Sequence, residues 1–487
     1  MEQKKNIGVG LKLISVILGA MMGGFMWRCR GEGGFGSFWG LCSVGMILFM
    51  LIWNFYAPKA KMRYEMILLG ALYTGLGVNG YATVIEQLAG VVWSDLPYQG
   101  EVVYSPVSPK SGLIIILLMA MTFVPLYAFF VGSLFSDKEY KPVHYLIPIV
   151  LYFGVSTLMK ATLAHPILAA INPEQVEWAA RGLADYGLDY ATPAKAYMDH
   201  FLNRDFSQEI PYFENYFMSI DHISDVAGVI SIWAYLAVRK DKIALAVSAF
   251  ISLNTAVVST LGSSMISIMF RSGFFEGVTI PRFLETGSGW GLWEYLTGAS
   301  VGFGTLLILA LLPKKYTARE SVKPSALFNN SKFHFVFNLL LSVFMLAVVA
   351  MRAVGLRIGS LLENFGVLED SSPTGDILMI LLAIAMGIFL INKLWGNRFR
   401  NGTVGFGVDA FTFARVALPA YFTLCIVLYF FTNHAPLIIF PYGEIKSLSG
   451  FAYMMTGSEW IELTLMLVSA AVVNILYWPA RKKLGKK

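Results

Sequence analysis

Basic residues in this chain alternate between dense and sparse connections, in step with about twelve apolar segments. Each segment is close to the ~20 residues that an α-helix needs to cross ~30 Å of hydrocarbon. The composition, 56% hydrophobic and 14% charged, agrees with this pattern. It predicts an all-α, polytopic integral membrane protein of about 12 transmembrane helices. The predicted spans are 7–27, 39–57, 66–92, 112–134, 144–163, 222–238, 243–270, 290–312, 335–357, 376–395, 412–433 and 459–480.

The charge distribution also predicts the orientation. One set of connections, which includes both chain ends, carries 25 of the 37 basic residues and 7 of the 31 acidic ones. Positive residues resist export, so we expect a protein of the cell membrane with cytoplasmic N- and C-termini. The first apolar run is too long for a signal peptide and is followed by Trp27, Arg28 and Cys29, so we expect a retained helix.

The connections divide the chain into four parts. Residues 1–221 form a first membrane half, with five spans and a long external loop at 164–221. Central hairpins occupy 222–313, a cytoplasmic linker 314–334, and C-terminal membrane helices 335–487. In the external loop, the stretch from Pro173 to Gly187 predicts a short amphipathic helix. Loops of this length usually have a function or cap a cavity.

Two hairpins share an order of features. In each, a Met-rich helix end is followed by an Arg (Arg28 or Arg271), a glycine-rich external loop and a Trp-Gly helix start (Trp39 or Trp290). They lie six predicted spans apart in the same orientation. A parallel six-plus-six pseudo-repeat explains this shared order of features. Chance is the rival explanation, because Gly, Trp and Phe are common throughout.

Arginine is unevenly shared between the two sides. Lysines outnumber arginines 18 to 7 inside, whereas the external set has 4 lysines and 8 arginines. Sorting by charge does not explain this difference, but the planar guanidinium fork fits a carboxylate or phosphate. Local pairing of each Arg with a nearby Glu is the other interpretation. The external arginines beside span ends or in the glycine-rich loops are Arg28, Arg30, Arg271, Arg282, Arg352 and Arg357.

Charges inside predicted spans are costly and are therefore candidates for function. They are Glu86, Lys160, Glu294 and Arg352, all toward the outer ends of their spans. Together these patterns predict an outward-facing site for an anionic substrate, with no catalytic residue assigned. The predicted substrate-binding residues are Arg28, Arg30, Glu86, Arg271, Arg282, Glu294, Arg352 and Arg357.

The external loop region ends in a further polar group. Asp221, His222 and Asp225 have helical spacings that allow convergence on one ion, but solvated acids and helix caps are the plainer interpretation, so we predict no metal site. The glycine-rich loop near Gly33 lacks the Lys of a P-loop, and no cofactor is expected. Nothing indicates nucleic-acid binding. Cys29 and Cys42 are either paired or two unrelated thiols.

Three functions fit these patterns. The first is a multi-pass membrane transporter or flippase for an anionic solute or a lipid-linked headgroup. The second is a membrane-embedded transferase that acts on a lipid-borne substrate at the outer leaflet, and the third is a structural subunit of a membrane complex. Membrane lipids and an anionic small-molecule or lipid-linked substrate are the expected partners. The solute, ion coupling and oligomeric state are left open by the sequence.

Overall fold

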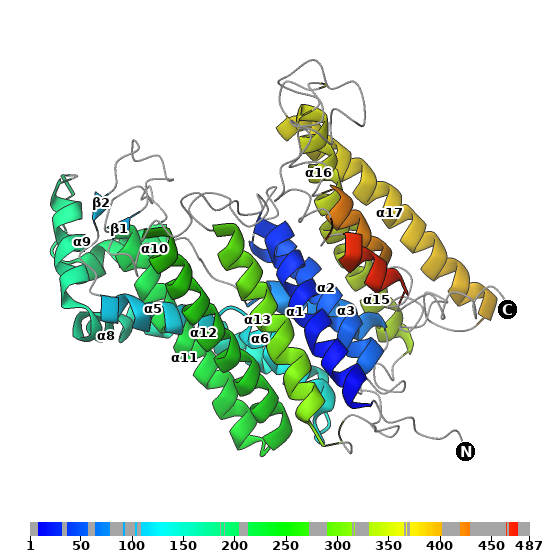
Figure 1. Ribbon diagram of the computed structural model, residues 1–487, viewed down its shortest axis with the longest axis horizontal. Helices are drawn as coiled ribbons and strands as arrows, with labels where there is room; N and C mark the ends of the chain where they lie inside the picture. The colour runs from blue at the N-terminus through cyan, green and yellow to red at the C-terminus, as the bar shows by residue number, and fades with distance from the viewer. Residues whose placement is uncertain are drawn as a thin grey trace.

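The fold is built almost entirely from helices (Figure 1). This computed structural model describes residues 8–31, 37–56, 64–77, 91–92, 103–104, 109–185, 187–188, 190–203, 213–271, 290–313, 316, 331–364, 367, 371–401, 419–428, 464 and 467–475. The labelled elements are α1 (Val9–Gly31), α2 (Ser37–Phe55), α3 (Tyr64–Gly75), β1 (Val91–Val92), β2 (Val103–Tyr104), α5 (Pro109–Met121), α6 (Pro125–Phe135), α7 (Pro142–Ala161), α8 (Ala164–Ile171), α9 (Pro173–Asp185), α10 (Pro193–Asn203), α11 (Phe213–Val238), α12 (Lys242–Arg271), α13 (Trp290–Leu311), α15 (Ser331–Ser342), the π-helical segment η2 (Val343–Val349), α16 (Ala350–Asn364) and α17 (Ser371–Asn401).

Four helices are long and apolar enough to cross a membrane within the described residues. They are Val9–Arg28, Pro142–Ala161, Lys242–Gly262 and Glu294–Leu311. A fifth candidate is the bent pair formed by Gly112–Met121 and Pro125–Phe135. The prediction of an α-helical chain with several membrane-spanning segments is therefore confirmed, with four or five candidate spans in this part of the chain.

The helix ends agree closely with prediction where an apolar run is uninterrupted. Helices α7, α12 and α13 begin and end within two residues of the predicted spans. Helix α11 differs, because it begins at Phe213 rather than at 222. Its first two turns carry Glu214, Asn215 and Ser219 among aromatic residues. Because these residues are polar, a search for continuous apolar runs does not detect this part of the helix.

The predicted span 112–134 is present as a bent pair of helices rather than one continuous helix. Helices α5 and α6 meet at an angle of 43°. Pro125 is the first residue of α6 and has no backbone N–H to donate to Met121, so the helical ladder stops there. The intervening Thr122 instead closes a tight turn through its N–H on the Met119 carbonyl at 2.9 Å.

Helices α1 and α13 cross at backbone contact. Two pairs of glycines spaced four apart meet here, Gly19 and Gly23 on α1 with Gly302 and Gly298 on α13. A Cβ built on Gly19 would lie 2.7 Å from the Gly302 carbonyl oxygen, and one on Gly302 would overlap the Gly19 carbonyl. Small residues at such spacing let helices approach closely in membranes. Close packing matters there because lipid tails are as apolar as the side chains, so the hydrophobic effect does not drive the helices together. The two helices run antiparallel.

The turn between α11 and α12 is organised by one buried carboxylate. Asp241 accepts hydrogen bonds from Ser136 Oγ at 2.6 Å and from the Tyr140 hydroxyl at 2.7 Å, and it caps α12 through the Ala244 N–H at 3.0 Å. Arg239 lies over the Tyr140 ring at 4.7 Å. The α6–α7 and α11–α12 connections are thus tied together at the same end of the molecule.

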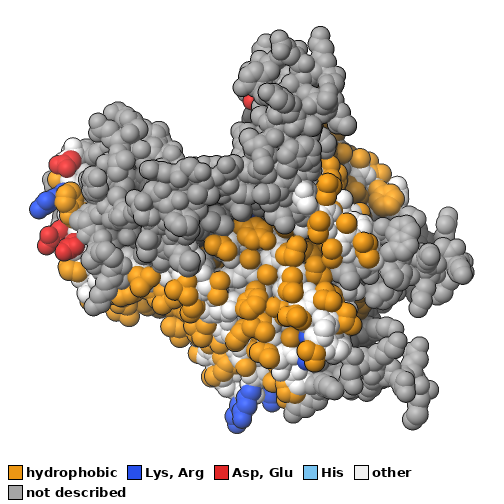
Figure 2. Space-filling view, in the orientation of Figure 1, with side chains coloured by type: hydrophobic (Ala, Val, Ile, Leu, Met, Phe, Trp, Pro, Cys, Tyr) orange, Lys and Arg blue, Asp and Glu red, His pale blue; other side chains and the backbone are white. Residues whose placement is uncertain are grey.

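The arrangement in space separates a charged end from an apolar belt. Helices α11, α12, α13 and α1 lie side by side, with α8–α10 grouped on the left and α16–α17 on the right (Figure 1). Figure 2 shows hydrophobic side chains across the face of these central helices, and Lys and Arg at its lower edge. Leu146, Val150, Leu253 and Leu261 are among the exposed apolar residues. Such a surface suits contact with lipid.

The region between α7 and α11 contains three short helices. Helix α9 covers Pro173–Asp185 and confirms the amphipathic helix predicted for this loop. Its buried residues include Ala179 and Leu183, which join the second apolar core formed with α8, α10 and the start of α11. Glu174, Glu177, Arg181 and Asp185 lie on its exposed side. The loop is therefore a packed helical layer over one end of α7 and α11.

Candidate functional site

Arg28 and Glu294 form a buried ion pair between helices α1 and α13. Arg28 Nη1 lies 2.8 Å from Glu294 Oε2, and the two side chains are 2% and 6% exposed. The residues are 266 positions apart in the chain. Taking both charges out of water is costly unless they are paired, so each residue fixes the other's position. The pair brings together two of the predicted site residues.

The close crossing of α1 and α13 at their glycines positions the Arg28–Glu294 ion pair. On α1, Gly23 and Trp27 pack against Gly298, which puts Arg28 beside Glu294, one turn nearer the N-terminus of α13. The ring of Phe25 meets Tyr295 edge to face at 5.3 Å. Trp27 also packs against Phe123, with ring centroids 6.0 Å apart. Phe123 belongs to the break between α5 and α6, so the ion pair lies next to that break.

The remaining predicted site residues lie partly or wholly outside the described residues. Arg30 belongs to the last turn of α1 and Arg271 ends α12. Arg352 and Arg357 belong to α16. The positions of Glu86 and Arg282 lie outside the described residues. The outward Arg group therefore stays a prediction, except for the observed contact of Arg28 with Glu294.

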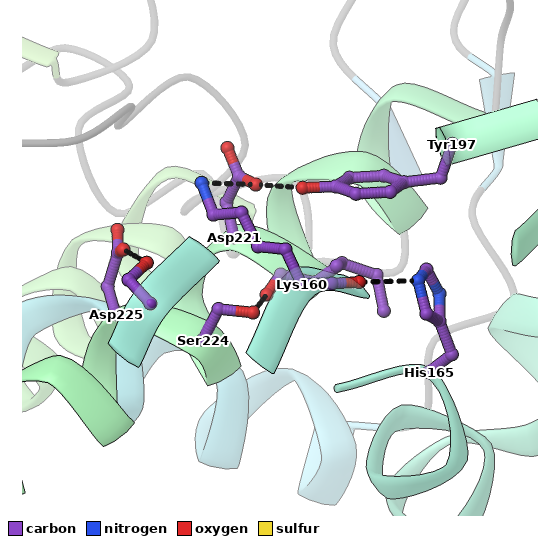
Figure 3. Close-up of polar contacts among 8 residues, drawn as sticks. Lys160, His165, Tyr197, Asp221, Ser224 and Asp225 are labelled. Carbon is purple, nitrogen blue, oxygen red and sulfur yellow. Dashed lines mark hydrogen bonds and ion pairs between the residues drawn. The ribbon is translucent and has the colours of Figure 1, made fainter. Parts of the chain in front are cut away.

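A second polar group lies where α7 meets α11, beneath α8 and α10. Lys160 Nζ lies 2.9 Å from Asp221 Oδ1, and the Tyr197 hydroxyl donates to the same oxygen at 2.6 Å. Figure 3 shows Lys160 and Tyr197 converging on Asp221 from two different helices. The Lys160 and Asp221 side chains are 12% and 19% exposed, so this contact lies at the edge of the buried region.

One turn further along α11 the polar group becomes fully buried. Ser156 donates to Asp225 Oδ1, and Asp225 is only 1% exposed. His222 and Tyr152 are buried to the same degree, and neither His222 Nδ1 nor the Tyr152 hydroxyl has a hydrogen-bond partner among the described residues. Unpartnered buried polar atoms are rare and need an explanation. These two lie within one contact between helices.

Sequence reasoning identified Asp221, Asp225 and Lys160 but missed Tyr152, Ser156 and the contact between the two helices. Tyr152, Ser156 and Lys160 are spaced four apart on α7, and Asp221 and Asp225 are spaced four apart on α11. Residues at this spacing lie along one face of a helix. The signal was thus present on each helix, but nothing in the sequence said that these two faces meet.

His165 belongs to the same layer but lies outside the span. Its Nε2 contacts the Lys160 carbonyl at 2.9 Å and its Nδ1 contacts the Tyr216 hydroxyl at 2.8 Å. Because a carbonyl can only accept, Nε2 carries the proton of the neutral ring. Burial lowers the pKa of His165, and the bond to the Lys160 carbonyl opposes this only in part. Burial and the Asp221 charge raise the pKa of Tyr197, so its hydroxyl remains a donor.

The alternative of a metal site gains nothing from these contacts. Within the described part of the chain, no group of three or more His, Cys, Asp or Glu residues is placed to hold a metal ion. Asp221 faces Lys160 and Tyr197, whereas Asp225 faces Ser156. Cys42 is a buried free thiol, which agrees with the interpretation of Cys42 as unpaired.

Comparison with known proteins adds no relative. No protein-family model, no curated protein and no solved structure matches the chain. The functional argument therefore rests on the two buried polar groups.

Proposed function

We propose that the chain is a multi-pass transporter or flippase for an anionic solute or a lipid-linked headgroup. In this proposal about twelve spans cross the cell membrane, both termini are cytoplasmic, and the outward Arg/Glu site includes the eight predicted residues. The observation that carries the proposal is the buried Arg28–Glu294 pair beside the broken α5–α6 segment.

Arg28 supplies the chemistry for holding an anion. A guanidinium offers a planar fork of donors that fits a carboxylate or phosphate, and inside a membrane it needs a counter-charge at all times. Glu294 provides that counter-charge at 2.8 Å. We infer that the anionic group of the substrate exchanges with Glu294 on Arg28. The exchange keeps Arg28 paired and changes the contact between α1 and α13, which couples binding to a helix movement.

The break between α5 and α6 is a position where the helix can bend without breaking further backbone hydrogen bonds. Discontinuous helices line the substrate sites of many transporters, because the interrupted backbone both faces a cavity and can bend. Here the 43° bend lies at Thr122–Val124, and Phe123 contacts Trp27, the neighbour of Arg28. A change in the Arg28 contact is therefore transmitted directly to the break.

The six-plus-six pseudo-repeat has less support. A two-fold axis along the membrane normal that relates α1–α2 to α12–α13 would pair the contact of α1 with α13 to an equivalent contact of α2 with α12. Helices α1 and α13 pack along their length, but α2 and α12 have no comparable contact among the described residues. The duplication stays a prediction, and the proposed transport mechanism does not depend on it.

The transferase alternative is less well supported by the same geometry. An acyl or glycosyl transferase of this kind needs an activated nucleophile, commonly a hydroxyl or thiol next to a base such as histidine. The buried hydroxyl of Ser156 donates to Asp225 rather than to an imidazole, and Cys42 is a buried free thiol. The structural-subunit alternative predicts no ligand response at all.

The test uses a variant that removes both charges together. Replacing a buried ion pair by apolar residues of similar volume is often neutral or stabilising, whereas removing one partner costs about 3–5 kcal/mol. We therefore expect Arg28→Met with Glu294→Leu to fold, and the single change Glu294→Leu to lower the unfolding temperature. Inorganic phosphate, a dicarboxylate and short-chain phosphatidic acid serve as probes of the purified protein.

At least one probe should raise the unfolding temperature of the unaltered protein, and the double variant should lose this response. Arg181→Met, at an exposed Arg on α9 that lies over Trp178, is the matched control and should keep it. The same variants in proteoliposomes then report flux of the active probe. An anion response that survives in the double variant would show that Arg28 is not the anion-binding residue.

A further inference from the structure

The contact between α7 and α11 is an antiparallel series of facing polar residues. Lys160 faces Asp221, Ser156 faces Asp225, and Tyr152 packs against Gly228 (Figure 3 shows the first two levels). A Cβ on Gly228 would lie 2.7 Å from the Tyr152 ring, so the glycine makes room for the aromatic side chain. The polar series begins at the edge of the buried region and continues to its interior.

Depth separates the two carboxylates. Asp221 is 19% exposed by its side chain and is paired with Lys160, while Asp225 is 1% exposed. One helical turn separates them, which is about 6 Å along the axis. His222 lies between them in the chain and is also 1% exposed. A proton that binds at Asp221 therefore has a second carboxylate, Asp225, one helical turn deeper.

Two polar atoms next to these carboxylates lack hydrogen-bond partners in the described residues. The Tyr152 hydroxyl is fully buried, and Tyr152 lies one turn from Ser156, the donor to Asp225, on the same face of α7. His222 Nδ1 is buried, and His222 directly follows Asp221 on α11. An ionised carboxylate can only accept hydrogen bonds, whereas a protonated one also donates. Protonation of the group would supply the donor that these two atoms can use.

We propose that Asp225 is a reversible proton-binding site, loaded from the outer side through Asp221 and His222. The proton adds to a carboxylate oxygen of Asp225, and the resulting O–H donates to the Tyr152 hydroxyl oxygen or to His222. Release returns the proton by the same path. Ser156 donates to Asp225 in the observed state, and protonation adds a donor for the Tyr152 hydroxyl or His222, so the two states differ in the partners of the buried groups.

The other groups around Asp225 are compatible with a proton as the ligand. Helix α7 contributes Lys160, whose positive charge next to Asp221 disfavours the binding of a metal cation nearby. Helices α8 and α10 contribute His165 and Tyr197 to the outer level. Helix α9 turns Gln175 toward Ser219 on α11 and keeps its charged residues exposed. Helices α5 and α12 carry no charged residue in 112–121 and 243–270.

Proton binding at Asp225 is a property of the α7–α11 contact and stands by itself. Its role as the coupling ion for the anionic substrate rests on the proposed function. In that role, uptake of one proton with the anion would offset the charge of the substrate during transport. The first experiment therefore measures the proton without any substrate.

The experiment is an infrared titration of the purified protein from about pH 3 to about pH 10, which begins below the ordinary carboxyl pKa values. A protonated carboxyl has a C=O band that disappears on ionisation. We expect a band that Asp225→Asn removes and that Asp185→Asn, the same change at an exposed carboxylate of α9, leaves in place. Ser156→Ala removes a donor to the ionised form and should move the midpoint upward by about 1 pH unit.

Several outcomes would overturn the proposal. They are an Asp225→Asn spectrum identical to that of the unaltered protein, a Ser156→Ala midpoint that does not move, and a band abolished by sodium at constant pH. If Asp225→Asn fails to fold, the Ser156→Ala shift decides. The Arg28→Met, Glu294→Leu variant should keep the Asp225 band, so an anion response that survives in this variant together with an intact band would contradict only the proposed transport function.

Discussion

At the scale of single residues, the buried polar side chains act by holding helices in defined pairs. Asp241 ties the α6–α7 connection to the start of α12, and Glu294 ties α13 to α1. His165 does the same for α8, because its two nitrogens reach the end of α7 and Tyr216 on α11. Each is a site where one substitution would release two elements together.

His165 also predicts a pH dependence of stability. In the unfolded chain its pKa is near 6.5, and burial lowers the pKa in the folded protein. Below about pH 6.5 the unfolded chain therefore gains a proton that the folded protein resists, so stability falls as the pH falls. We expect the unfolding temperature to drop between about pH 7.5 and about pH 5, and to drop less in His165→Gln.

Tyr216→Phe is the matched control for this prediction. It removes the hydroxyl that contacts His165 Nδ1 but leaves the imidazole able to titrate, so the acid-dependent loss should remain. Equal losses in the unaltered protein and in His165→Gln would assign the effect to other groups.

The sequence predicted the chemical character of the buried residues better than their partners. Arg28 was expected to matter because arginines outnumber lysines in the external connections, and Glu294 because charges in apolar spans are costly. Their contact across 266 positions could not be predicted from local Arg–Glu proximity, since it depends on which helices pack together. The glycines at four-residue spacing on α1 and α13 were the available signal for that packing.

At the scale of helices, long apolar runs determined the elements and backbone chemistry interrupted them. Runs without proline near their middle, such as those of α12 and α13, were predicted with accurate ends. The run 112–134 has the same apolar content, but Pro125 lacks the N–H that would continue the helix. Proline is tolerated inside many membrane helices, and α7 contains Pro148, so composition alone does not locate a break.

The crossing of α1 and α13 gives a test at this scale. Gly302→Ala should lower the unfolding temperature, because the new Cβ overlaps the Gly19 carbonyl and forces the backbones apart. Overpacking of this kind costs about 1–3 kcal/mol. Gly154→Ala on α7, where nothing lies within 4 Å of the new Cβ, is the control and should leave the temperature unchanged or raise it. Similar values for both variants would show that α1 and α13 are not closely packed.

At the scale of the whole molecule, the charge asymmetry predicts which connections face the cytoplasm. Cysteines introduced singly at Ser108 and Ser371 should react with an impermeant maleimide on intact cells, whereas those at Ala60 and Ser321 should not. The parent protein has Cys29, Cys42 and Cys425 replaced, and membranes opened with detergent give the reference for full labelling. Labelling of the opposite pair would reverse the orientation on which the outer location of Arg28 and Asp225 depends.

The pairing of Arg28 with Glu294 has a consequence for how the chain enters the membrane. Helix α1 is synthesised first, but its glycine face and its counter-charge are completed only by α13. At about 5–20 residues per second, the 266 intervening positions take on the order of tens of seconds to translate. During that interval the Arg28 guanidinium has to reach toward the phosphate level of the bilayer. Assembly of this protein is therefore completed late, when α13 replaces lipid as the partner of α1.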